Sequence, residues 1–142
     1  MDTNELIRTG VSDWNRRDKD AFLTNFDPSC EITGPGGLML RGRDGAELFW
    51  HIYQDAFPDN HITVRAIVGT ADAATVEAVF EGTHAAALRR VDGSQVVMTG
   101  RTARITYAAV HTYRNKQITT LHLYFDQTEL LAQLGVGMPP RA

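Results

Sequence analysis

The side chains best suited to acid/base chemistry fall at the end of one predicted strand, over residues 118–125. Side chains alternate between the two faces of a strand. His122, Tyr124 and Asp126 therefore share one face, while leucine and phenylalanine side chains take the other. If the polar face points into a pocket, an imidazole, a phenol and a carboxylate line it. If it points outward, the same groups are solvated or lie at an interface.

Asp126 has two interpretations that both stay open. A carboxylate in an apolar pocket has a raised pKa and can exchange protons near neutral pH, as a general acid or base must. Asp126 and Glu129 also have the spacing of a capping box, and aspartate is among the best N-cap residues of a helix. The two roles exclude each other only if the side chain folds back onto the helix amides.

Two further histidines lie in predicted strands. His84 shares strand parity with Phe80, so it points where that apolar residue points, either as a pocket group or as a hydrogen-bonded core histidine. His111 shares parity with Ile105 and Tyr107, and we interpret it as a surface or interface histidine.

The sequence lacks the residue patterns that several other kinds of chemistry require. None of the five histidines has the His-x-x-x-His spacing of common zinc sites, so we predict no metal. No serine lies in a Gly-x-Ser-x-Gly elbow. The glycine-rich stretch at 34–37 fits neither a phosphate loop nor a dinucleotide fingerprint, and it predicts a turn.

Composition narrows the class of protein. A chain of 142 residues predicts one domain over residues 1–142. A net charge of −3 provides no cationic surplus for nucleic acid. The single cysteine, Cys30, favours a reducing, cytoplasmic location. No secretory signal is visible in residues 1–13, and no apolar run is long enough for a membrane span.

Hydrophobic periodicity predicts helices first and strands afterwards. The expected helices cover 3–17, a short segment after Asp18 that Pro28 ends, and about 43–57; a fourth begins at Asp126 and ends near Gly135. The expected strands cover 61–70, 75–88, 95–113 and 118–125, with a short one at 31–33.

These elements predict an α+β cone, a curved and mainly antiparallel sheet covered by three N-terminal helices, with a short C-terminal helix. The middle strands are too long to stay flat. A pocket should lie between helices and sheet. We expect its lining to include Trp50, Tyr53, Phe80, His84, His122 and Tyr124.

Three segments resemble the SnoaL-like polyketide cyclases of the nuclear-transport-factor-2-like superfamily. They are Phe80-Glu81-Gly82-Thr83-His84, Phe57-Pro58-Asp59, and Tyr124-Phe125-Asp126-Gln127 running into residues 130–135. The resemblance implies a deep apolar pocket and a cofactor-free intramolecular aldol closure of a polyketide-like small molecule. It implies that Asp126 is the general acid/base, that His84 helps to bind or polarise the substrate, and that a homodimer forms through the sheet.

This chain departs from the relatives at His122, where they commonly have tryptophan, and at Tyr124, where they often have glutamine. The substrate therefore need not be an aromatic polyketide. A non-catalytic small-ligand-binding module of the same fold is the main alternative. An epoxide hydrolase needs a second carboxylate, which residues 104–113 lack, and Asp126 with Tyr124 is too little to claim an isomerase.

Overall fold

The computed structural model describes residues 2–136. The first part of the chain forms three helices, α1 (Thr3–Asn15), α2 (Lys19–Thr24) and α3 (Gly42–Ala56). A fourth helix, α4 (Gln127–Gln133), follows the last strand. The strands are β1 (Phe26–Gly34), β2 (Leu38–Arg41), β3 (His61–Gly69), β4 (Ala73–Thr83), β5 (Leu88–Arg89), β6 (Gln95–Val96), β7 (Thr102–Arg114) and β8 (Gln117–Tyr124). None of the helices in this range is long and apolar enough to cross a bilayer.

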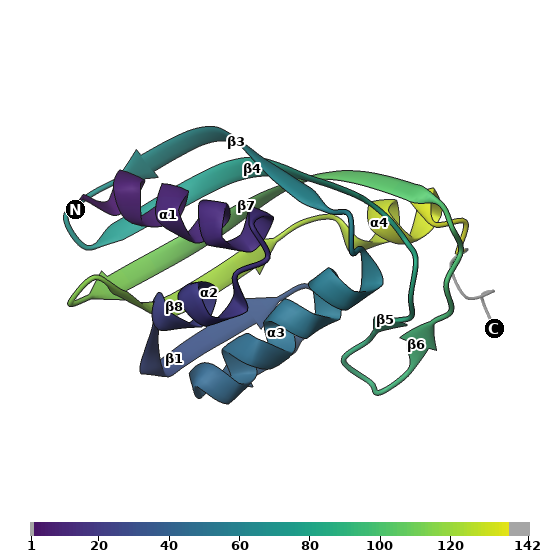
Figure 1. The fold of residues 1–142 in the computed structure, drawn as a ribbon, viewed down its shortest axis with the longest axis horizontal. Coiled ribbons are helices and arrows are strands. Elements are labelled where there is room, and N and C mark those ends of the chain that lie inside the picture. Colours follow the sequence, from purple (N-terminus) through teal and green to yellow (C-terminus); the bar gives the residue numbers. More distant parts are fainter. Residues whose placement is uncertain (1, 137–142) are drawn as a thin grey trace.

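Six strands form one sheet in the order β2-β1-β8-β7-β4-β3. Every neighbouring pair is antiparallel except β1 and β8, which run parallel. The short strands β5 and β6 form a separate hairpin. The sheet curves, and the three N-terminal helices lie along one of its faces (Figure 1). The predicted α+β cone with a mainly antiparallel sheet is thus confirmed.

Side-chain caps explain where three of the helices begin. Asp2, Asp18 and Asp126 each accept a hydrogen bond from a backbone N–H in the first turn of the helix that follows. Such caps satisfy amides that have no partner inside the helix. Helix α3 begins without a side-chain cap.

The boundaries differ from the sequence prediction around Pro28. The short helix α2 ends at Thr24, and Pro28 lies within β1. Proline lacks an amide hydrogen, and the pairing of β1 with β8 shifts register between Phe26 and Glu31, which accommodates it. Strand β2 was not predicted, and the predicted strand 95–113 consists of β6 and β7 with an irregular segment between them.

A closed ring of buried hydrogen bonds joins α1 to α3 and to the start of β3. Trp14 donates its indole N–H to Asn60 Oδ1 (2.7 Å), Asn60 donates to Gln54 Oε1 (2.8 Å), and Gln54 donates to the carbonyl of Trp14 (3.1 Å). Asn60 is only 1% exposed. Buried polar groups need partners, and in this ring each side chain provides one for the next.

Gly82 of β4 allows this ring to lie close to the sheet. A Cβ at position 82 would lie 3.0 Å from the Cβ of Asn60 and 3.1 Å from that of Phe57. The pairing of β4 with β7 continues through Gly82 without a register shift. Glycine therefore serves close packing at this position.

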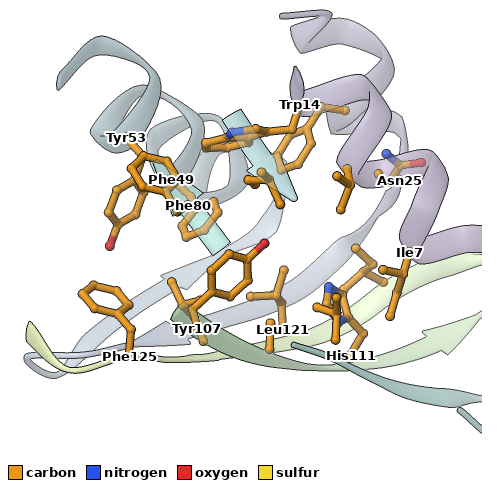
Figure 2. A pocket seen from close by; sticks show the side chains of 18 of the residues that line it. Ile7, Trp14, Asn25, Phe49, Tyr53, Phe80, Tyr107, His111, Leu121 and Phe125 are labelled. Atoms are coloured by element: carbon orange, nitrogen blue, oxygen red, sulfur yellow. The ribbon is translucent and has the colours of Figure 1, made fainter. Parts of the chain in front are cut away.

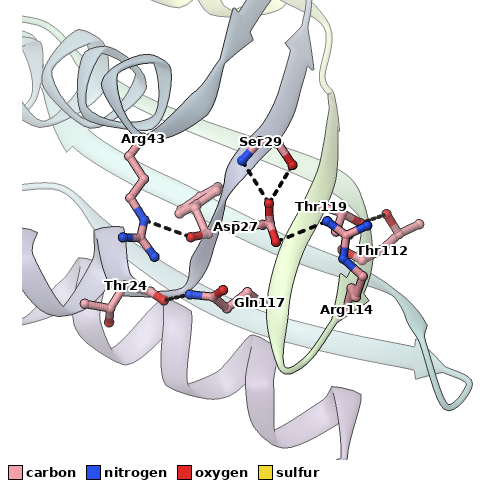
Figure 3. A network of polar contacts seen from close by, with 9 residues as sticks. Thr24, Asp27, Ser29, Arg43, Thr112, Arg114, Gln117 and Thr119 are labelled. Atoms are coloured by element: carbon pink, nitrogen blue, oxygen red, sulfur yellow. Dashed lines mark hydrogen bonds and ion pairs between the residues drawn. The ribbon is translucent and has the colours of Figure 1, made fainter.

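A second polar network fastens β1 to the turn between β7 and β8 (Figure 3). Asp27 accepts hydrogen bonds from the amide and hydroxyl of Ser29 and pairs with Arg114 at 3.3 Å. Gln117 donates to the carbonyl of Thr24, which ties the same turn to α2. The hydrogen bonds from Ser29, with the charge of Arg114, lower the pKa of Asp27.

We predict that Asn60→Ala lowers the free energy of unfolding by about 2–4 kcal/mol, because it leaves the Trp14 indole N–H and Oε1 of Gln54 buried without their partner. Chemical denaturation monitored by circular dichroism measures the change. Asn4→Ala, at an exposed position of α1, is the matched control and should change the value by less than about 0.5 kcal/mol. A loss of similar size in both variants would contradict the prediction.

Candidate functional site

A cavity of about 120 Å³ lies between the helices and the concave face of the sheet. Strands β4, β7 and β8 form its floor, while α2, α3 and the loops add mainly aromatic side chains. Helix α1 lines it with Leu6, Ile7, Gly10, Val11 and Trp14. Figure 2 shows aromatic rings closing over this space from the helix side and from the sheet side. Space of this size can hold a small organic molecule or several waters.

The walls are apolar, and the few polar groups are uncharged. Of the described residues that line the cavity, none is Asp, Glu, Lys or Arg. Its polar side chains include Asn25, Tyr53, Tyr107, His111 and Tyr113. Ionised groups are costly to bury in such surroundings, so this cavity suits a neutral ligand.

His111 is the most distinctive polar group of the cavity. It lies on β7, is 8% exposed, and stacks nearly parallel to Tyr113 with ring centroids 6.0 Å apart. Its Nδ1 atom is buried and has no hydrogen-bond partner among the described residues. Burial lowers the pKa of His111 to about 4, more than the backbone groups of Ala109 and Ala74 raise it. The imidazole is therefore neutral at physiological pH.

Three tyrosines add neutral hydroxyls. Burial raises the pKa of Tyr53 to about 12, and it raises the pKa of Tyr107 and Tyr113 well above the usual value for a phenol. In Figure 2 the Tyr107 side chain extends from the sheet toward the helices, and Tyr53 descends from α3. Such hydroxyls can donate to or accept from a ligand oxygen.

The structure places two of the five predicted substrate-binding residues in the cavity wall, namely Tyr53 and Phe80. Trp50 lies outside the lining set, because its ring packs into the aromatic core against Trp14 and Phe22, with centroids 5.2 Å away in both cases. Trp50 thus contacts the cavity-lining side chains of Trp14 and Phe22 without lining the cavity itself.

The expectation that His122 and Tyr124 line the cavity is wrong. On β8 the apolar side chains Leu121 and Leu123 face the cavity, and Tyr124 is 58% exposed. Burial of the leucines is favoured by the hydrophobic effect, and the strand alternation then directs His122 and Tyr124 to the outer face.

Asp126 is the N-cap of α4. Its Oδ1 accepts the backbone N–H of Glu129 at 3.1 Å, and the residue is exposed. The cavity-lining residues on either side of it are Phe125 and Leu130, but Asp126 itself is not among them. The capping role that the spacing indicated is thus present, and its Oδ2 is left for other partners.

His84 is fully buried but does not line the cavity. Its Nδ1 accepts the backbone N–H of Thr99 (3.2 Å) and lies 3.0 Å from the hydroxyl of that residue. Its backbone N–H donates to the carbonyl of Arg101. The pKa of His84 is lowered, mainly by burial. These bonds of His84 hold together the two ends of the 84–101 excursion, the segment that carries β5 and β6.

The sequence analysis missed His111, Tyr107 and Asn25 as cavity residues. The interpretation of His111 as a surface or interface histidine is wrong. A usable signal was present, since His111 has the strand parity of Ile105 and Ala109, which point inward. Asn25 lies at the end of a short helix, where residue spacing carries no such signal.

Among residues 2–136, no group of three or more His, Cys, Asp or Glu side chains is placed to hold a metal ion. The free thiol of Cys30 is buried, and its pKa is raised chiefly by that burial. Its contact is with the carbonyl of Gly42.

The sequence matches the model of the SnoaL-like domain family over residues 7–121. The chain therefore belongs to the SnoaL-like domain family. A search of curated protein sequences finds no match.

Solved structures of other proteins show the same fold. A protein from Catenulispora acidiphila with a ketosteroid isomerase-like fold, in complex with trimethylamine, is 19% identical with a TM-score of 0.78, covering 99% of this chain and 100% of that one. A candidate SnoaL-like polyketide cyclase from Jannaschia sp. CCS1 is 16% identical with a TM-score of 0.80, covering 96% and 92%. IdmH, a candidate polyketide cyclase from Streptomyces antibioticus, is 28% identical with a TM-score of 0.75, covering 94% and 98%.

We predict that His111 makes the fold sensitive to acid. The pKa of His111 is about 4 in the folded state and about 6.5 in an unfolded chain, so unfolding takes up a proton between these values. The free energy of unfolding should have its full value above about pH 6.5 and should fall by roughly 3 kcal/mol as the pH drops toward 4. Denaturant unfolding at a series of pH values measures this slope.

His111→Phe should remove this part of the slope, because phenylalanine does not titrate. His84, whose pKa is also lowered, continues to contribute in the same direction. His61→Gln, at an exposed position outside the cavity, is the matched control. An unchanged slope in His111→Phe would show that His111 is not buried in its neutral form.

Proposed function

We propose that this protein binds a neutral, ring-containing, mainly apolar small molecule in its cavity and catalyses proton-transfer chemistry on it without a cofactor, in the manner of a SnoaL-like cyclase. The observation that carries the proposal is the neutral imidazole of His111, whose Nδ1 has no hydrogen-bond partner among residues 2–136, in a cavity that no charged residue of this range lines. Family membership supports the reaction class, an intramolecular aldol-type closure of a polyketide-like substrate.

His111 is proposed to hydrogen-bond a carbonyl oxygen of the substrate. When a proton leaves the neighbouring carbon, the C–H electron pair becomes part of an enolate and negative charge develops on that oxygen. A neutral imidazole N–H in a low-dielectric cavity stabilises this charge, and the low pKa of His111 keeps the ring neutral for the task. The enolate is common to aldol closure and to isomerisation.

Asp126 is proposed as the group that accepts the proton and returns it. It follows Phe125, whose ring lines the cavity, and its cap bond uses only Oδ1. A positioned general base contributes typically about 10²–10⁴ in rate. His84 is proposed to act on the substrate only indirectly, by holding the 84–101 excursion in place.

The second candidate function is binding without catalysis. It is favoured by one observation, that Asp126 is exposed and engaged as a helix cap. The two candidates share the ligand class and differ in whether a proton on a bound ketone becomes labile.

We predict that the wild-type protein accelerates exchange of the α-protons of 1-tetralone, a neutral bicyclic ketone, in deuterated buffer followed by NMR. Asp126→Asn should lose about 10²-fold or more of the acceleration and keep its melting temperature, because asparagine caps helices about as well as aspartate. His111→Phe should lose both acceleration and affinity for the ketone.

The outcomes separate the candidates. Binding of 1-tetralone without accelerated exchange indicates the non-catalytic module. Full acceleration in Asp126→Asn together with its loss in His111→Phe would assign the base to His111. An exposed glutamate, Glu5→Gln in α1, provides the control for loss of a surface carboxylate.

We also propose a homodimer that forms through the outer face of the sheet. This face carries Tyr124 of β8 and Met39 of β2, both strongly exposed, and Val110 of β7, which pairs with His122 of β8. Such apolar side chains on one sheet face favour an isologous contact with a second copy.

Val110→Arg should convert the dimer to a monomer in light scattering, because it places like charges near the centre of the contact. Val97→Arg introduces the same residue at a 78% exposed position of the hairpin segment and should leave the mass unchanged. A wild-type monomer at micromolar concentration would contradict the proposal.

A further inference from the structure

Gly10 lies in the middle of α1, where glycine has no conformational task. Apart from proline, glycine is the poorest helix former. The backbone of Gly10 is not in the left-handed region, so any residue can adopt its conformation. A helix of 13 residues that starts with a good cap would be more stable with alanine at this position.

Close packing does not require glycine there either. A Cβ at position 10 would meet only Asn25 Nδ2, at 3.8 Å, an ordinary contact distance. At Gly69 and Gly82, by contrast, a Cβ would approach neighbouring atoms to 2.5 and 3.0 Å. Gly10 lines the cavity. Its missing side chain therefore leaves a notch in the cavity wall, bounded by Gly10 and Asn25.

Asn25 gives this notch a fixed polar wall. Its Nδ2 donates one hydrogen to Oδ2 of the buried Asp13 at 3.0 Å, and Asp13 pairs with Arg16. The backbone of Asn25 is held as well, since its carbonyl accepts the N–H of Ile118. The Asp13 contact sets the orientation of the amide, and the second N–H of Nδ2 is left for a ligand.

We propose that the notch at Gly10 is a specificity-determining subsite, which takes an oxygen-bearing substituent of the ring ligand and hydrogen-bonds it through Asn25 Nδ2. This inference rests on the proposed binding of a neutral ring compound but not on the proposed chemistry. It assigns to Gly10 a role in ligand selection at the expense of helix stability.

The test measures stability and binding in the same variants. Gly10→Ala should raise the melting temperature by about 4 °C, because alanine favours the helix. The same change should weaken binding of 2-naphthol several-fold, and Gly10→Leu should weaken it more than tenfold, since the added atoms fill the notch. Ser12→Ala, which favours the helix at an exposed position, is the matched control and should leave binding unchanged.

Equilibrium dialysis against 2-naphthol and naphthalene distinguishes the outcomes. The proposal expects the preference for 2-naphthol over naphthalene to shrink in both Gly10 variants. If Gly10→Leu binds 2-naphthol with wild-type affinity, the proposed subsite is wrong, while the proposed function is unaffected. An equal loss for both probes would overturn its assignment to an oxygen. No binding of either probe to the wild-type protein would overturn the proposed function and the notch together.

Discussion

The ring of hydrogen bonds through Trp14, Asn60 and Gln54 is the constraint on which the rest of the structure depends. It joins the end of α1, the end of α3 and the start of β3 at one buried point. The helix layer is thereby held at a set distance and angle from the sheet. Polar groups buried together are costly unless each has a partner, so this junction tolerates one arrangement and excludes slippage of the helices.

The cavity follows from that arrangement. The Asn60 junction holds α1 and α3, and the hydrogen bond from Gln117 to Thr24 holds α2, so that the helices bridge the concave sheet without collapsing fully onto it. Trp14 takes part in both features, since its indole N–H enters the ring and its side chain lines the cavity. Its polar end is satisfied within the protein, and its apolar body is available to a ligand.

The electrostatic character of the site is set by burial more than by charged partners. The cavity contains phenols and an imidazole whose ordinary ionisation is suppressed. Exposed charged residues pair with one another away from the cavity, as Glu81 and Arg104 do at 3.2 Å. Neutral donors and acceptors in an apolar site bind without the desolvation cost of ions, and each bond they make is stronger than in water.

Sequence alone determined the class of fold and the presence of an aromatic pocket. Helical periodicity around Trp14 and Tyr53 and strand alternation around Val76 and Phe80 are local properties, which depend on neighbours a few residues away. The capping role of Asp126 was equally readable, because a cap involves only the residue three positions later. The resemblance of short motifs then indicated the family, which the match over residues 7–121 confirmed.

Only the tertiary structure decided which face of each strand meets the cavity. Alternation divides β8 into two faces without saying which is inside, and the polar face with His122 looked the more functional although the leucine face is buried. His111 gained its environment from helix α1, which is distant in sequence, and Asn25 from its contact with Asp13. The pKa of a side chain and the notch at Gly10 depend on such long-range packing, for which a single sequence carries no local signal.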